Sequence, residues 1–170
     1  MAEPGVAVVL VGHGAPPRDY PRRRLEEFFA LGGRKGSDVA VLSQWLSLDR
    51  EIREWPRTPE NDPYHAGLMA LAGRIAAESG LSVRVAFNEF CGPTLPEAVD
   101  RAVGEGFGIV VVVPSMMTPG GNHSEREIPE ALAKVRAQHP HLRVVYAWPF
   151  DPERLAGFFA DHVRRAVAAG

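Results

Sequence analysis

The sequence lacks the features that mark several large classes of protein. It contains a single cysteine, Cys91, so neither an internal disulfide nor a cysteine-rich zinc site is expected. The longest apolar run is far shorter than a membrane span, and residues 1–11 lack the basic start and long apolar core of a signal peptide. The formal net charge of -2 gives no basic excess for nucleic acid. We therefore expect a cytoplasmic protein with no nucleic-acid partner and no membrane association.

Several familiar catalytic motifs are also missing. There is no Walker lysine motif, no dinucleotide-binding glycine pattern and no G-x-S-x-G nucleophile elbow. A phosphohistidine enzyme needs an arginine beside its nucleophile to hold phosphate, and Gly12 occupies the position before His13. The function must therefore come from another kind of site.

The sequence does contain a regular alternation of strand and helix patterns. Short apolar runs predict strands, and amphipathic segments with helical spacing lie between them. The predicted strands cover residues 6–11, 83–87, 109–113 and 142–147. Such alternation implies βαβ units, a parallel sheet and helices on both of its faces. We expect one α/β domain over residues 1–170, with three layers (α/β/α) around a four-stranded parallel sheet.

Two helix starts can be placed from local signals. Asp19 is expected to cap a helix that runs roughly over residues 20–31. Further along, Ser124 and Glu127 match a capping box before a helix that ends near residue 138. The alternative is that Pro129 is the first residue of that helix.

A helical segment between the first and second predicted strands carries a long apolar stripe. Its apolar residues recur at alternating steps of four and three, which is helical spacing. They are Val41, Trp45, Leu48, Ile52 and Trp55. A proline-rich stretch over residues 56–63 follows, which we interpret as a lid or an interface element. Because the stripe exceeds the needs of one core, we expect a homodimer that buries part of segment 38–66.

Three loops that follow predicted strands carry polar side chains. His13 lies between Gly12 and Gly14 after the first strand, Glu89 follows the second, and His123 follows the third. Ligands bind outside the carboxyl ends of strands in open parallel sheets, so these side chains are expected at one edge. Two neutral imidazoles and a carboxylate suit a first-row divalent metal or general acid–base work. The alternative is that each histidine is an ordinary loop residue whose ring bonds to backbone groups.

The sequence resembles the class II chelatases, specifically the small sirohydrochlorin chelatases that insert cobalt or iron into a tetrapyrrole. Three motifs in order carry the resemblance: VGHG at residues 11–14, FNEFCGPTLP at 87–96, and the stretch 113–129 with its G-x-H and acidic-Ile-Pro motifs. Two features depart from the family pattern. Ala15 stands where the family usually has serine, and the segment around 32–66 is longer than in compact members.

This resemblance implies a chelatase-like domain with an inserted helical segment around 32–66. It implies an enzyme, a metal chelatase of the lyase class, acting in cobalamin or siroheme biosynthesis. His13 and His123 are then the metal ligands and catalytic residues, with Glu89 as a candidate partner in both roles. The divalent ion, Co²⁺, Fe²⁺ or Ni²⁺, is a substrate, and no permanently bound cofactor is expected. A homodimer is a further expectation, because the protoporphyrin ferrochelatases carry two such domains in one chain.

The substrate that the resemblance implies, a sirohydrochlorin-type tetrapyrrole, has many carboxylates around an apolar ring. Arginine can bind a carboxylate through two parallel hydrogen bonds. The candidate carboxylate clamps are Arg18, Arg22 and Arg126. The candidate apolar wall consists of Phe90, Met116 and Met117, for which packing in the core is the alternative. A metal-binding or tetrapyrrole-binding carrier without turnover is a second functional hypothesis, since it would need the same histidines.

Overall fold

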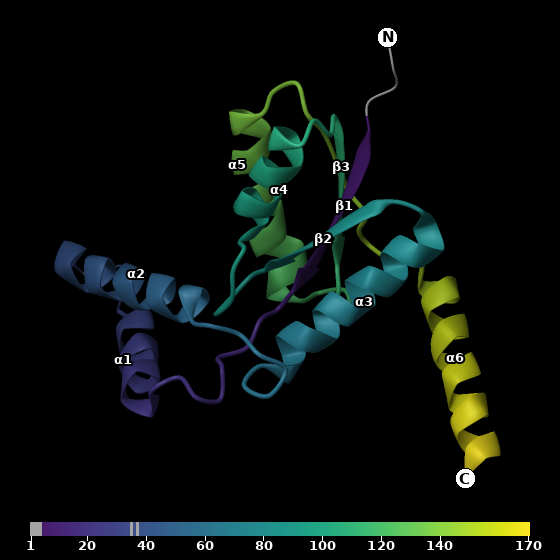
Figure 1. Ribbon diagram of the computed structural model, residues 1–170, viewed down its shortest axis with the longest axis horizontal. Helices are drawn as coiled ribbons and strands as arrows, with labels where there is room; N and C mark the ends of the chain where they lie inside the picture. Colours follow the sequence, from purple (N-terminus) through teal and green to yellow (C-terminus); the bar gives the residue numbers. More distant parts are fainter. Residues whose placement is uncertain (1–4, 35, 37) are drawn as a thin grey trace.

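A four-stranded sheet with the order β2-β1-β3-β4 forms the centre of the computed structural model, which describes residues 5–34, 36 and 38–170 (Figure 1). Each strand runs parallel to its neighbours. The strands are β1 (Val6–Gly12), β2 (Ser82–Phe87), β3 (Ile109–Pro114) and β4 (Arg143–Tyr146). The predicted parallel sheet is confirmed, and each predicted strand agrees with the structure to within one residue at either end.

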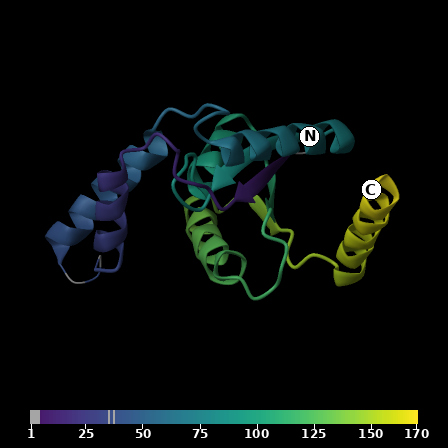
Figure 2. The ribbon, with the colours of Figure 1, turned by 90° about the horizontal axis from the view of Figure 1, so that it is seen from below.

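Helices cover both faces of the sheet and also extend beyond it on two sides. The helices of the described residues are α1 (Arg22–Gly32), α2 (Val39–Glu54), α3 (Pro63–Ser79), α4 (Leu95–Gly104), the π-helix η1 (His123–Glu127), α5 (Ile128–Gln138) and α6 (Pro152–Ala169). Helices α4 and α5 pack on one face and α3 on the other, which confirms the three-layer α/β class (Figures 1 and 2). None of these helices is long and apolar enough to cross a lipid bilayer.

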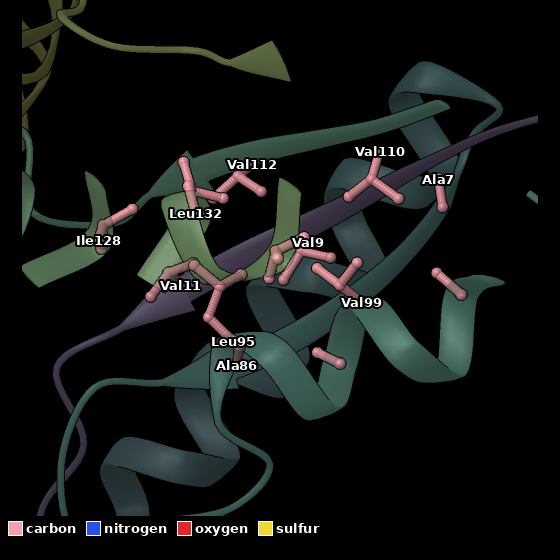
Figure 3. Close-up of a cluster of buried hydrophobic side chains, with 13 residues drawn as sticks. Ala7, Val9, Val11, Ala86, Leu95, Val99, Val110, Val112, Ile128 and Leu132 are labelled. Atoms are coloured by element: carbon pink, nitrogen blue, oxygen red, sulfur yellow. The ribbon is translucent and has the colours of Figure 1, made fainter. Parts of the chain in front are cut away.

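The side chains of β1 are buried on both faces because this strand lies between β2 and β3. Val9 and Val11 are fully buried and belong to the cluster formed with α4 and α5, part of which Figure 3 shows. Leu10 points to the opposite face, where it packs with Leu68 of α3. Successive strand residues face opposite sides of a sheet, so an unbroken apolar run is what a strand buried on both faces requires.

Helices α1 and α2 form a unit to one side of the sheet (Figure 1). The buried members of their cluster are Tyr20, Phe28, Leu48, Ile52 and Phe90. The helical stripe predicted for α2 is therefore used inside its own chain: Leu48 and Ile52 are buried, and the Trp45 ring stacks on Phe28 at 5.3 Å. The stripe is therefore no larger than the core of this chain requires, and it gives no support for a homodimer interface.

The caps predicted at Asp19 and at Ser124 differ from the structure. Helix α1 begins at Arg22 without a side-chain cap, and the Asp19 carboxylate instead accepts a hydrogen bond from Trp55 Nε1 at 3.1 Å. The capping box predicted from Ser124 and Glu127 is also wrong. These two residues lie within the π-helix η1, and Pro129 lies in the first turn of α5, closer to the alternative.

A buried ion pair between Arg57 and Asp62 joins four segments of the chain. The Arg57 Nη1 atom lies 2.6 Å from Asp62 Oδ2, and the two side chains are 8% and 1% exposed. The same guanidinium group donates to the carbonyl oxygens of Ala15, Ile52 and Phe90. Because Asp62 also caps α3, the loops after β1 and β2 are fixed relative to the end of α2 and the start of α3.

We expect Arg57→Met to lower the free energy of unfolding by about 3–5 kcal/mol, because it leaves the buried Asp62 carboxylate without its partner. The control is Arg24→Met, which breaks a pair with Glu51 at the surface and should cost much less. Urea unfolding at one fixed protein concentration measures both. Equal losses for the two variants would contradict the structural role given to Arg57.

Candidate metal centre

His13, Glu89 and His123 meet at the carboxyl ends of β1, β2 and β3. Each residue offers one possible ligand atom, a ring nitrogen or a carboxylate oxygen, and these three atoms all lie within 4.8 Å of one another. The His13 and His123 rings are perpendicular, with their centroids 4.5 Å apart, and His13 Nε2 is 3.8 Å from Glu89 Oε2. These strands are neighbours in the sheet order, which explains how residues so distant in sequence come together. We call these three residues the triad.

The hydrogen bonds of both histidines favour the same tautomer. His13 Nδ1 lies 2.8 Å from the carbonyl oxygen of Gly14, and His123 Nδ1 lies 2.6 Å from Glu127 Oε2. A carbonyl or an ionised carboxylate only accepts hydrogen bonds, so Nδ1 carries the proton in each neutral ring. The lone pair of each ring is therefore on Nε2, the atom left for a metal ion.

The first two loops of the triad are bonded directly to each other. The amides of Asn88 and Glu89 donate to the carbonyl oxygens of Gly12 and His13, at 3.0 and 2.8 Å. Gly14 has a φ of +94°, and a Cβ atom there would lie 1.9 Å from the carbonyl oxygen of Glu89. Only glycine fits this position, since any side chain would push the Glu89 loop away.

A cavity of about 400 Å³ opens beside the triad, between it and the α1–α2 unit. Phe90 lies between them: its ring centroid is 6.4 Å from that of His13 and 6.0 Å from that of Phe29. Its φ of +58° is uncommon for a residue other than glycine. The other aromatic and acidic side chains in the cavity lining are Phe28, Trp45, Asp49, Glu89 and Glu127. The cavity thus has an aromatic wall and acidic groups near the triad.

The other predicted substrate-binding residues have contacts of their own outside the triad. Met116 packs against the core between the sheet and α4–α5, and Met117 lines a second, more apolar hollow near α6. Arg18 is exposed, and Arg22 and Arg126 pair with acidic residues one helical turn away, Glu26 and Glu130. Among the described residues, the hydrogen bonds and ion pairs of these arginines do not reach the triad.

Aromatic residues that sequence reasoning did not assign to the site support two of its loops. The Tyr64 hydroxyl accepts a hydrogen bond from the His13 amide at 2.9 Å. The Tyr146 hydroxyl donates to the carbonyl oxygen of Ser124 at 2.9 Å, and burial raises the pKa of Tyr146 to about 12, which keeps this donor protonated. Trp148 Nε1 donates to Glu125 at 3.2 Å. Two of these residues could have been found from their positions in the chain, because Tyr146 is the last residue of β4 and Tyr64 lies in the first turn of α3.

The fold and the site together define an α/β protein whose sheet carries, at its carboxyl edge, the imidazole and carboxylate groups that suit a first-row divalent metal. The sequence model of the CbiX family matches residues 60–166, more than half of the chain, so the protein belongs to the CbiX family. Glu89 and His123 lie within the matched segment, and His13 lies before it. The resemblance seen in the sequence is confirmed.

Two curated relatives and one solved structure show the extent of the similarity. A sirohydrochlorin cobaltochelatase from Priestia megaterium is 35% identical over 72 residues, which are 42% of this chain and 23% of the relative. A sirohydrochlorin cobaltochelatase from Methanococcus maripaludis is 36% identical over 66 residues, 38% of this chain and 45% of the relative. The alignments thus span less than half of each relative. A solved CbiX protein from Marinobacter aquaeolei VT8, assigned to cobalamin (vitamin B12) biosynthesis, aligns over 96% of both chains with a TM-score of 0.58 and 19% identity, and so shows the shared fold.

Gly14→Ala is expected to separate the His13 and Glu89 loops. The new Cβ atom would meet a backbone oxygen and force a left-handed conformation, so we expect a loss of at least about 1 kcal/mol in unfolding free energy and weaker Co²⁺ binding. Gly33→Ala is the control, because a Cβ atom added there would meet no other side chain or backbone atom within 4 Å, and the φ of Gly33 is −68°. Urea unfolding and Co²⁺ titration measure the two effects. A Gly14→Ala variant that is as stable as Gly33→Ala and binds Co²⁺ as tightly would contradict this account.

Proposed function

We propose that this protein inserts a divalent metal ion, Co²⁺ or Fe²⁺, into a sirohydrochlorin-type tetrapyrrole. The observation that carries the proposal is the triad, in which a ring nitrogen of each histidine and a carboxylate oxygen lie within 4.8 Å of one another at the edge of the sheet. The names of the curated relatives, sirohydrochlorin cobaltochelatase and ferrochelatase, support the same reaction. The physiological metal, the pathway and the cytoplasmic location stay predictions.

The triad has the chemistry that metal insertion requires. The metal ion must lose water, and the two inner pyrrole N–H groups of the ring must lose their protons before their nitrogens bind the ion. Neutral imidazoles bind a first-row metal without cancelling its charge, so the ion remains available for transfer to the ring. The Glu89 carboxylate is 41% exposed and can accept a proton from the ring or pass it to water.

The cavity beside the triad supports the proposal that a tetrapyrrole ring binds there. A flat apolar macrocycle needs an apolar wall, and the exposed ring of Phe29 together with Phe90 provides one next to His13. The carboxylates around the ring need cationic partners. Arg18, Arg22 and Arg126 remain proposed clamps, and Arg22 and Arg126 would exchange their exposed helical partners for the substrate.

His123→Ala is expected to lower the rate of metal insertion by at least about tenfold, because the ion loses one of its proposed ligands. His141→Ala is the matched control: His141 is an exposed residue of the turn before β4 and should leave the rate unchanged. Insertion of Co²⁺ into sirohydrochlorin under anaerobic conditions, followed by absorbance, measures both variants. The unfolding free energy of each should stay near that of the parent protein, since loop side chains contribute little packing.

The same assay separates the enzyme from the carrier hypothesis. A carrier would bind the metal ion and the ring tightly, but the metallated product would form no faster in its presence than in buffer alone. That result, with His123→Ala indistinguishable from the parent, would overturn the chelatase proposal.

We also propose that the chain acts as a homodimer. Helix α6 contains no buried residue and extends away from the sheet (Figure 2). Its exposed apolar residues are Phe158, Phe159, Val163 and Val167. Segment 38–66, predicted from the sequence to lie in the interface, exposes a smaller apolar set on α2: Val39, Leu42 and Leu46. The α6 face is therefore the stronger candidate for the interface, since large exposed apolar patches mark association sites.

Light scattering at micromolar protein concentration tests the assembly. The parent protein should have the mass of a dimer, and Val163→Asp should reduce it to a monomer because a charge would be buried in the interface. Leu46→Asp on α2 should keep the dimer. A monomeric parent would refute the homodimer, and the reverse pattern of the two variants would place the interface on segment 38–66.

A further inference from the structure

Glu127 makes two contacts that the proposed reaction does not yet use. Its Oε2 atom lies 2.6 Å from His123 Nδ1, and its Oε1 atom accepts a hydrogen bond from the side-chain amide of Asn122. The carboxylate is thus held from two sides. The His123 side chain beside it is only 19% exposed, which limits competition from water for the same bond.

The π-helix η1 brings the two side chains together. The amide of Ile128 donates to the carbonyl oxygen of His123, five residues earlier, which is the π-helical pattern. Residues four apart lie on the same side of such a turn, and the Glu127 carboxylate meets the His123 ring there. Single π turns inside helices occur frequently at functional sites. The proposed ligand His123 and its partner Glu127 are the first and last residues of η1.

The turn is anchored to the rest of the fold on both sides. Ser124 Oγ donates to the carbonyl oxygen of Met116 at 3.3 Å, and the Ser124 carbonyl oxygen accepts from Tyr146. Ser124 itself is 1% exposed. The orientation of Glu127 relative to His123 therefore depends on bonds to the loop after β3 and to the end of β4, and not on the helix alone.

The two histidines of the triad differ in the group that holds Nδ1. His13 bonds to a neutral backbone carbonyl, whereas His123 bonds to a carboxylate. A carboxylate behind a metal-binding imidazole fixes the tautomer and increases the basicity of the ligating nitrogen. We therefore expect His123 to bind the metal ion more strongly than His13.

We propose that Glu127 is a positioning residue, whose carboxylate holds His123 in the orientation and tautomer that present Nε2 to the metal ion. This inference rests on the proposed metal-binding role of His123. A purely structural i,i+4 contact on a helix surface would instead add slightly to stability and leave the metal affinity unchanged.

Co²⁺ titration of the whole protein with three variants tests the proposal. Glu127→Ala should weaken Co²⁺ binding by roughly 10- to 100-fold. Glu127→Gln keeps an acceptor oxygen at the same position and should recover most of the affinity. Glu130→Gln, which changes an exposed carboxylate paired with Arg126 one turn further on, is the control and should bind like the parent. A Glu127→Ala variant with parental affinity would overturn the inference.

Nitrogen NMR of the His123 ring, recorded on metal-free protein, provides an independent readout. The parent should show the proton on Nδ1, and Glu127→Ala should lose this preference, whereas an unchanged tautomer would overturn the inference. His123→Ala distinguishes this result from a failure of the proposed function. If that variant binds Co²⁺ like the parent, the metal role of His123 fails, and the tautomer in Glu127→Ala still decides whether Glu127 positions the ring.

Discussion

The buried guanidinium group of Arg57 holds together the segments from which the site is built. It pairs with Asp62, which is almost fully buried, and donates to backbone carbonyls in the loops after β1 and β2 and at the end of α2. Removing two charged groups from water is costly unless they pair closely and form further hydrogen bonds, so this cluster tolerates little rearrangement. The conformation of Phe90, with its positive φ, and the position of the Ala15 carbonyl both depend on it.

The triad therefore rests on two separate supports. Arg57 and the close approach of Gly14 to Glu89 fix the first two loops, while Tyr146 and Ser124 fix the third from the other side of β3. Short loops on neighbouring parallel strands then bring three side chains to one edge, as ligand sites in open α/β sheets commonly do. This arrangement presents two imidazole nitrogens and a carboxylate to a metal ion next to an aromatic cavity, which is the basis of the proposed metal insertion.

The sequence predicts the sheet and the location of the triad because both follow from local pattern and a general rule. Unbroken β-branched runs mark strands, and side chains just after parallel strands meet at one edge. The role of Glu127 could not be predicted in this way. Ser124 and Glu127 match a capping box in the sequence, but Ser124 instead donates to the Met116 carbonyl oxygen and accepts from Tyr146, and both residues lie in a π-helix. The bond from Tyr146, 22 residues further along the chain, is a tertiary contact that local pattern does not reveal. Likewise, the α2 stripe indicated a buried face but not that α1 and Phe90 would cover it.

The central claim is that His13 and His123 bind the metal ion through their Nε2 atoms. X-ray absorption at the cobalt edge of the Co²⁺-loaded protein tests this most directly, because imidazole ligands give a characteristic multiple-scattering signal. The account predicts two imidazole nitrogens at about 2.1 Å in the parent, the usual distance for a zinc-like metal, and one in His13→Ala. An imidazole signal that is absent from the parent, or that persists unchanged in a variant lacking both histidines, would contradict it.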